Sequence, residues 1–164
     1  MNHKTSGAVS VWAPNTYHLA VVERLLAQPS PIQASDRLQS WADLRNTAAR
    51  QPTAGKVVAE LKFAFWEKMF TAGQDSRIWL SHFRTSFPGA PSGLAIPAAR
   101  AVAHNDLKAI RLLRNRIAHH EPIFNRNIAD EYRRMREMIA WRSPVAATWM
   151  DRKQGVAVLV PLKP

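Results

Sequence analysis

The 164-residue sequence contains no cysteine, only six glycines, and 12 acidic residues against 23 basic ones. Without cysteine, the chain can form neither a disulfide nor a thiolate zinc site, and it has no cysteine nucleophile. No stretch approaches the roughly 18 consecutive apolar residues of a membrane span, and residues 1–14 lack the apolar segment of a signal peptide. We therefore expect a soluble, cytoplasmic protein without a membrane span.

The shortage of acidic residues leaves a formal net charge of +11. An excess of this size argues for a polyanionic partner, of which a nucleic acid is the first candidate and an anionic membrane the second. A basic protein that is merely well solvated explains the charge equally well. The apolar share of 46% is ordinary for a globular domain and sufficient for a hydrophobic core.

Apolar residues recur at helical spacing along most of the chain, which predicts an all-α fold. Helices are expected over residues 17–27, 35–50, 55–71, 97–104, 125–141 and 144–152, the last behind a cap at Ser143. A further helix should run from a cap at Asp75 to the turn-rich loop 87–93. Another should run from a cap at Asn105 or Asp106 to about Glu121. The expected organisation is a flexible N-terminal lead (1–14), a single helical domain (15–152) and an irregular C-terminal tail (153–164). Only residues 156–162 of this tail have a strand-like pattern.

The expected helix that ends near Glu121 carries most of the candidate functional residues. At roughly 100° per residue, one side of this helix is apolar and should face the core; it contains Leu107, Ile110, Leu113 and Ile117. The nearly opposite side contains Lys108, Leu112, Asn115 and His119. Arg111 lies next to this polar side, and Arg114 and His120 lie at its two edges.

Each of these polar residues also has an ordinary structural interpretation. A histidine in the position of His119 is often an ordinary solvated surface residue. The stem of Arg114 can cover the edge of the core while its charge stays in water. The order His119-His120-Glu121 lacks the spacing of a helical zinc site, since adjacent helical residues point about 100° apart. We therefore expect no metal and no other cofactor.

The stretch from Leu113 to Phe124, Leu-Arg-Asn-Arg-Ile-Ala-His-His-Glu-Pro-Ile-Phe, resembles the signature of the Abi-like (abortive infection) family in the HEPN superfamily. The motif of that superfamily is an arginine, usually followed by a polar residue, and a histidine after four to six intervening residues. Arg114, Asn115 and His119 fit this motif. Residues 60–70 are similar to the family's Leu-x-Phe-Gly-Phe-Trp segment, with Ala64 where glycine is common. The resemblance covers roughly residues 57–149.

This resemblance implies an HEPN-like helical bundle with short extra helices, and a metal-independent endoribonuclease of abortive-infection or toxin type. Such proteins typically dimerise, so that the motifs of two chains face one cleft. The implied catalytic residues are Arg114, Asn115 and His119, with His120 as a possible accessory residue. We expect RNA contacts from four further cations, Lys108, Arg111, Arg116 and Arg126. The implied partners are RNA, a second copy of the chain and a cognate antitoxin.

The residue types suit this reaction. RNA supplies its own nucleophile, the 2′-hydroxyl. A histidine with a pKa of about 6.5 can move protons at neutral pH, and an arginine offers a planar fork to phosphate oxygens. Arg114 and His119 are about 140° apart around an ideal helix, so they do not share a face. Either the long arginine curls around its own helix, or the arginine of one chain acts with the histidine of its twin. We expect the second arrangement, because the outward placement of Leu112, Asn115 and His119 calls for a partner surface.

Two other functions remain open from the sequence. The chain could be a non-catalytic RNA-binding or regulatory helical module that keeps the motif and the charge. It could also be a structural dimerisation domain in which Arg114 and His119 hold a buried polar network.

Overall fold

The computed structural model describes the backbone of residues 35–162 and the side chains of residues 42–162. Every regular element in this part of the chain is a helix, which confirms the all-α fold. The chain divides into two compact units, residues 1–61 and 62–164, and each is described by itself. The expected lead 1–14 and helix 17–27 lie outside the described residues, and the expected single domain over 15–152 stays a prediction.

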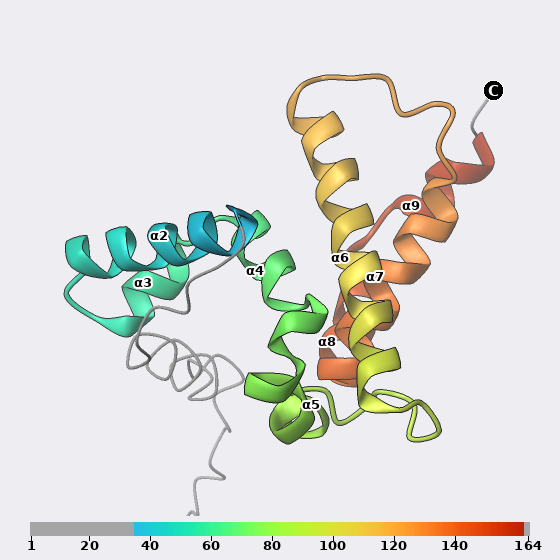
Figure 1. The fold of residues 1–164 in the computed structure, drawn as a ribbon. Coiled ribbons are helices and arrows are strands. Elements are labelled where there is room, and N and C mark those ends of the chain that lie inside the picture. The colour runs from blue at the N-terminus through green and yellow to red at the C-terminus, as the bar shows by residue number, and fades with distance from the viewer. Residues whose placement is uncertain (1–34, 163–164) are drawn as a thin grey trace, which may run out of the picture. The chain divides into compact units, whose positions relative to one another are not determined.

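The described part of the first unit consists of α2 (Ser35–Arg50) and α3 (Ala54–Glu60), which contact each other (Figure 1). The bounds expected for α2 are confirmed, because Gln51-Pro52 stops the helical pattern. Thr53 caps α3 by accepting a hydrogen bond from the Lys56 backbone N–H at 3.3 Å. Leu44 of α2 is fully buried.

The second unit begins with α4 (Phe63–Met69), the 3₁₀ turn η1 (Ala72–Gln74), the π-helical turn η2 (Asp75–Trp79) and α5 (Leu80–Ser86). It continues with α6 (Ile96–Ala118), α7 (Ile128–Arg142), α8 (Pro144–Lys153), α9 (Val156–Leu159) and the 3₁₀ turn η3 (Val160–Leu162). The long helices α6 and α7 lie side by side, joined by the loop at the top of Figure 1. α4 and α5 contact α6, and α8 contacts α7. None of the described helices is long and apolar enough to cross a bilayer.

Aromatic rings fill the core between α4, α5 and the following loop. Phe70 stacks on Trp79 with ring centroids 4.3 Å apart, and Phe83 and Phe87 pack around them. The indole N–H of Trp79 donates to the Met69 carbonyl at 2.7 Å, so the polar atom of this buried ring is satisfied. Ala99 and Ala103 of α6 are fully buried, because their small side chains admit neighbouring elements close to the helix.

The loop between α5 and α6 is fastened at two points. The Arg84 guanidinium donates to the Ala90 carbonyl at 3.2 Å, the Pro91 carbonyl at 2.8 Å, and also to Leu94. The Gly89 N–H donates to the carbonyl of Trp141, the penultimate residue of α7, at 2.9 Å. A turn-rich loop was expected here from its prolines and glycines, and the structure confirms it.

The expected single helix over 55–71 is wrong, because Leu61 and Lys62 adopt extended backbone conformations between α3 and α4. No glycine or proline marks this break. The chain passes here from the first compact unit to the second, so packing within each unit overrides a continuous helical pattern.

The expected break between residues 104 and 106 is also wrong, because α6 continues through it. Asp106 does not cap a helix. It is buried, and its carboxylate accepts a hydrogen bond from Arg134 of α7 at 3.3 Å. An aspartate in the middle of a helix can therefore accept a hydrogen bond from a neighbouring helix instead of from a local backbone N–H.

Asp75 was expected to cap a helix, and this is wrong for a similar reason. Its two carboxylate oxygens accept hydrogen bonds from Arg100 of α6 at 2.9 and 3.3 Å. The same guanidinium donates to the Phe70 carbonyl at 3.1 Å. Asp75 thus holds a buried arginine, and the helix starts with a π-helical turn.

The remaining helix ends agree with the sequence in one case and differ in two. Ser143 caps α8 by accepting from the Ala146 N–H at 3.2 Å, as expected. α7 begins at Ile128 instead of 125, because the Asn127 side chain accepts from the Asp130 N–H at 3.1 Å. The strand-like, irregular tail is wrong as far as Leu162, since α9 and η3 are helical turns.

Candidate functional site

The residues of the Arg114…His119 motif lie in the last two turns of α6. Arg114 and His119 are exposed, Asn115 is half-buried, and His119 is the residue at which the helix ends. Within one chain, Arg114 and His119 therefore hold no buried polar network, and a structural dimerisation domain would have to bury them between two copies. Leu112 lies on the same stretch with 44% of its surface exposed, as its place on the polar side predicted.

One residue of the expected core stripe is placed wrongly by the sequence. Leu113 is buried, and Leu107 and Ile110 are half-buried. Ile117, however, is 53% exposed, because no described side chain covers this side of the last turn of α6. The end of α6 therefore exposes two aliphatic side chains next to the motif.

The structure brings Arg114 and Asn115 together but does not join them to His119. The Arg114 guanidinium donates to the Asn115 side-chain carbonyl at 3.2 Å. The His119 backbone N–H donates to the Asn115 backbone carbonyl at 2.9 Å, which closes the last helical turn. In the described part of the chain, no hydrogen bond reaches the His119 imidazole, so the ring is available to a ligand.

Three of the four expected RNA-binding cations form ion pairs within the chain. Arg111 pairs with Glu67 of α4, and Arg126 pairs with Glu131 of α7. Arg116 lies 3.4 Å from Glu121 and donates to the Pro122 carbonyl at 2.7 Å. Lys108 is exposed and takes part in no ion pair among the described residues.

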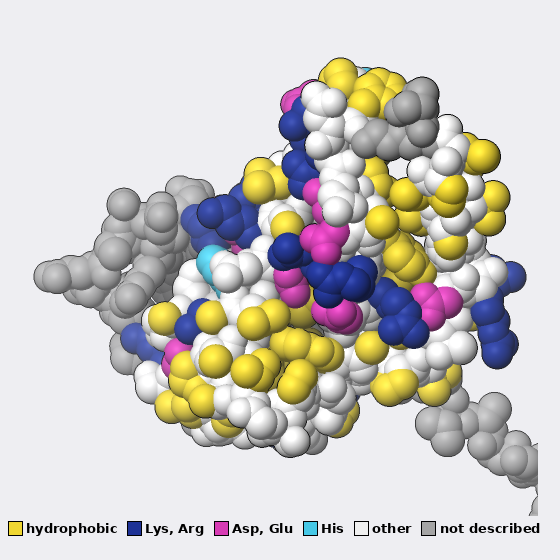
Figure 2. Space-filling model, turned by 90° about the vertical axis from the view of Figure 1, so that its right-hand side faces the viewer, with side chains coloured by type: hydrophobic (Ala, Val, Ile, Leu, Met, Phe, Trp, Pro, Cys, Tyr) yellow, Lys and Arg dark blue, Asp and Glu magenta, His cyan; other side chains and the backbone are white. Residues whose placement is uncertain are grey.

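This pairing extends over the whole second unit. Residues 62–162 contain eight carboxylates against sixteen lysines and arginines, and every one of these carboxylates pairs with an arginine. Figure 2 shows basic and acidic side chains interleaved across one face. Cations outside these pairs, Lys108 and Arg114 among them, therefore carry an uncompensated positive charge.

The chain reverses immediately after His119 through a left-handed residue. His120 has a φ of 55°. Its N–H donates to the Ile117 carbonyl at 3.1 Å, and the Glu121 N–H donates to the Arg116 carbonyl at 2.8 Å. These two bonds form the Schellman motif, in which glycine usually occupies the left-handed position. Sequence reasoning missed this feature because no glycine marks it.

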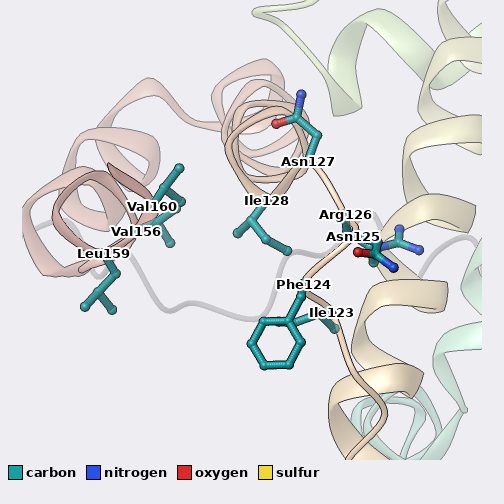
Figure 3. A pocket seen from close by; sticks show the side chains of 9 residues that line it. All are labelled: Ile123, Phe124, Asn125, Arg126, Asn127, Ile128, Val156, Leu159 and Val160. Atoms are coloured by element: carbon teal, nitrogen blue, oxygen red, sulfur yellow. The ribbon is translucent and has the colours of Figure 1, made fainter. Parts of the chain in front are cut away.

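An apolar groove of about 680 Å³ lies beside the loop that follows the motif. Its lining comes from Ile123, Phe124, Asn125, Arg126, Asn127, Ile128, Val156, Leu159 and Val160. In Figure 3, Ile128 lies between Phe124 of the loop and the side chains of α9 and η3. Phe124 is 69% exposed. The sequence carried no signal for this groove, since residues 156–162 were expected to be strand-like.

Two carboxylates fasten α7 to its neighbours and differ in their pKa. Burial raises the pKa of Asp106, although the hydrogen bond from Arg134 opposes this shift. The hydrogen bond from the Tyr132 hydroxyl, at 2.7 Å, lowers the pKa of Asp151, and Arg136 adds to this effect. Asp106 thereby joins α6 to α7, and Asp151 joins α8 to α7.

No cluster of three His, Asp or Glu side chains suited to a metal ion occurs in the described part of the chain. No protein-family model, no curated protein and no solved structure matches the sequence. Membership in the Abi-like family and the HEPN-like character of the bundle therefore stay predictions that rest on the residues quoted above.

Proposed function

We propose that the protein is a metal-independent endoribonuclease of abortive-infection or toxin type. The observation that carries the proposal is the end of α6, where the hydrogen-bonded pair of Arg114 and Asn115 and the unpartnered imidazole of His119 are all accessible. Arg114 adds an unpaired positive charge at this end, and the unpaired Lys108 lies further back on the same helix, so that α6 presents charge that suits a polyanion.

The proposed reaction is attack of a ribose 2′-hydroxyl on the adjacent phosphate, with departure of the 5′-oxygen. His119 exchanges protons with these oxygens, since an accessible imidazole can act as acid or base near neutral pH. Arg114 stabilises the charge that builds on the phosphate oxygens. The Asn115 carbonyl accepts from Arg114, which leaves the Asn115 NH₂ group to donate to phosphate.

A second copy of the chain completes the proposed site. Arg114 and His119 lie about 140° apart around α6, so one chain does not present both groups to the same phosphate. Ile117 and Leu112, exposed by 53% and 44%, provide apolar surface for a symmetric contact beside the motif. In this proposal, the protein acts in the cytoplasm, and a cognate antitoxin holds it inactive.

One observation favours a second function, a non-catalytic RNA-binding or regulatory module. A catalytic histidine usually has a partner that orients its ring, and the His119 imidazole has none among the described residues. The excess of cations would serve binding without cleavage equally well.

Cleavage of mixed cellular RNA in EDTA separates the two functions. The native protein should produce fragments with 2′,3′-cyclic phosphate or 3′-phosphate ends, and H119A should not. The matched control is H104A, which removes a half-buried histidine of α6 outside the motif and should keep cleavage. Salt-sensitive binding without cleavage, unchanged in H119A, would support the binding module instead. Equal cleavage by all three proteins would contradict the assignment of His119.

A further inference from the structure

The left-handed conformation of His120 is unusual. Among residues 35–162, His120 is the one non-glycine residue with a positive φ. For a residue with a Cβ atom this conformation costs roughly 1–2 kcal/mol relative to a right-handed one. Such a conformation persists only where the surrounding structure enforces it, and it occurs preferentially at functional sites.

The surrounding structure does enforce it here. Besides the two backbone hydrogen bonds of the Schellman motif, the Arg116 side chain reaches over the turn. It donates to the Pro122 carbonyl at 2.7 Å and pairs with Glu121 at 3.4 Å. The turn is thus held between Arg116, three residues before His119, and the two residues that follow His120.

The His120 ring contributes nothing comparable. It is exposed, and no hydrogen bond or ion pair within the described residues involves it. What the structure holds is the backbone of residue 120 and not its imidazole. A right-handed residue at this position would let α6 continue, so His119 would no longer be the residue at which the helix ends.

We propose that His120 is a positioning residue: its left-handed backbone ends α6 directly after His119 and fixes the His119 imidazole relative to the Arg114–Asn115 pair. This inference rests on the proposed function for its catalytic meaning. The accessory role expected for His120 is thereby assigned to its backbone instead of its ring.

A substitution series at position 120 tests the proposal. Glycine and asparagine adopt the left-handed region readily, alanine less so, and valine poorly. H120G and H120N should keep the rate of RNA cleavage within about twofold and leave its pH profile unchanged. H120V should lose about tenfold or more in kcat, since small displacements of catalytic groups have effects of this size. H120A should fall between them.

Two measurements that do not depend on cleavage accompany the series. The melting temperature of H120G should rise by about 4 °C, because glycine removes the cost of the left-handed backbone. The NMR signals of the His119 imidazole should stay in place in H120G and H120N and shift in H120V. Rates are compared at a temperature at which circular dichroism shows every variant to be folded.

Two results of the series at position 120 would overturn the proposal. Loss of cleavage in H120G with unchanged His119 signals would show that the His120 ring is catalytic and would overturn the proposal. Equal rates and equal His119 signals in all folded variants would show a merely stabilising residue and would also overturn it. If the native protein cleaves no RNA, the proposed function fails, while the melting temperatures and His119 signals still decide whether residue 120 positions His119.

Discussion

Asp106 of α6 and Asp151 of α8 each bind α7 through side-chain hydrogen bonds, and their pKa values shift in opposite directions. The Asp106 carboxylate is buried, so desolvation raises its pKa despite the hydrogen bond from Arg134. The Asp151 carboxylate accepts from Tyr132 and Arg136, and these bonds lower its pKa. The free energy of unfolding should therefore depend on pH in opposite directions at the two residues.

For Asp106, the stability linked to its raised pKa is present below about pH 3.8 and is lost as the pH rises through the higher native pKa. D106N mimics the protonated acid at every pH. Its melting temperature, relative to that of the native protein, should therefore be least favourable near pH 3 and improve as the pH rises to 7. Thermal denaturation across this range measures the difference, and a flat difference would contradict the raised pKa.

For Asp151, the stability linked to its lowered pKa is present above about pH 3.8 and is lost as the pH falls through the native pKa. D151N should therefore lower the melting temperature at pH 7, and the deficit should shrink below pH 3.8. Measured in the same buffers, D151N is the matched control for D106N, because the expected slopes have opposite signs.

At the scale of elements, the contact of Gly89 with α7 predicts a packing conflict. A Cβ atom on residue 89 would lie 2.7 Å from the Ala140 carbonyl oxygen and 3.2 Å from that of Trp141. These are backbone atoms that cannot turn aside, so G89A should reduce the free energy of unfolding by about 2 kcal/mol. Urea denaturation measures this loss.

Gly93 provides the control in the same loop. A Cβ atom there meets nothing within 4 Å, and its φ is not positive. G93A should therefore change the free energy of unfolding by less than about 0.5 kcal/mol. Equal losses in both variants would show that the loop tolerates no side chain anywhere, and the specific contact with α7 would then be wrong.

Helix ends were predictable where a local signal sets them. Ser143 and Pro144 supply a cap and a first-turn proline, and Gln51-Pro52 terminates α2. These signals act through neighbouring residues alone, so a single sequence contains them in full.

Elements set by distant partners were not predictable. Asp75 and Asp106 look like caps, yet their partners Arg100 and Arg134 are 25 and 28 residues away in the chain. The break at Leu61 likewise depends on tertiary packing. Of the candidate site, the sequence predicted the polar side of α6, but not the exposure of Ile117 or the groove beside α9, because both depend on what the fold leaves uncovered.

At the scale of the whole molecule, the pairing of carboxylates predicts which cations bind RNA. Arg114 lies at the motif and pairs with no carboxylate, so its contact with a phosphate should release a counterion. In R114Q, the slope of log Kd against log salt for single-stranded RNA should fall by about 0.7. R152Q removes an exposed cation of α8 and should leave the slope unchanged; equal effects would point to diffuse binding.

If two chains contact each other at the end of α6, one negative charge introduced there should dissociate the dimer. I117D places a carboxylate in the expected apolar contact, so sedimentation should show a monomer where the native protein is a dimer, and cleavage should be lost. V145D alters a still more exposed aliphatic residue, in α8, and should keep the dimer and the activity. A native protein that is monomeric and fully active would contradict the shared site.

The aromatic core described above also has an optical consequence. The Trp79 indole is buried against Phe70 and donates to a carbonyl, whereas 61% of Trp149 is exposed. Trp79 should emit at a shorter wavelength and resist quenching by acrylamide, while Trp149 emits as an indole in water. Trp66 and Trp141 are half-buried and contribute as well, so the quencher-resistant fluorescence that is lost in W79F reports the integrity of the core without any added label.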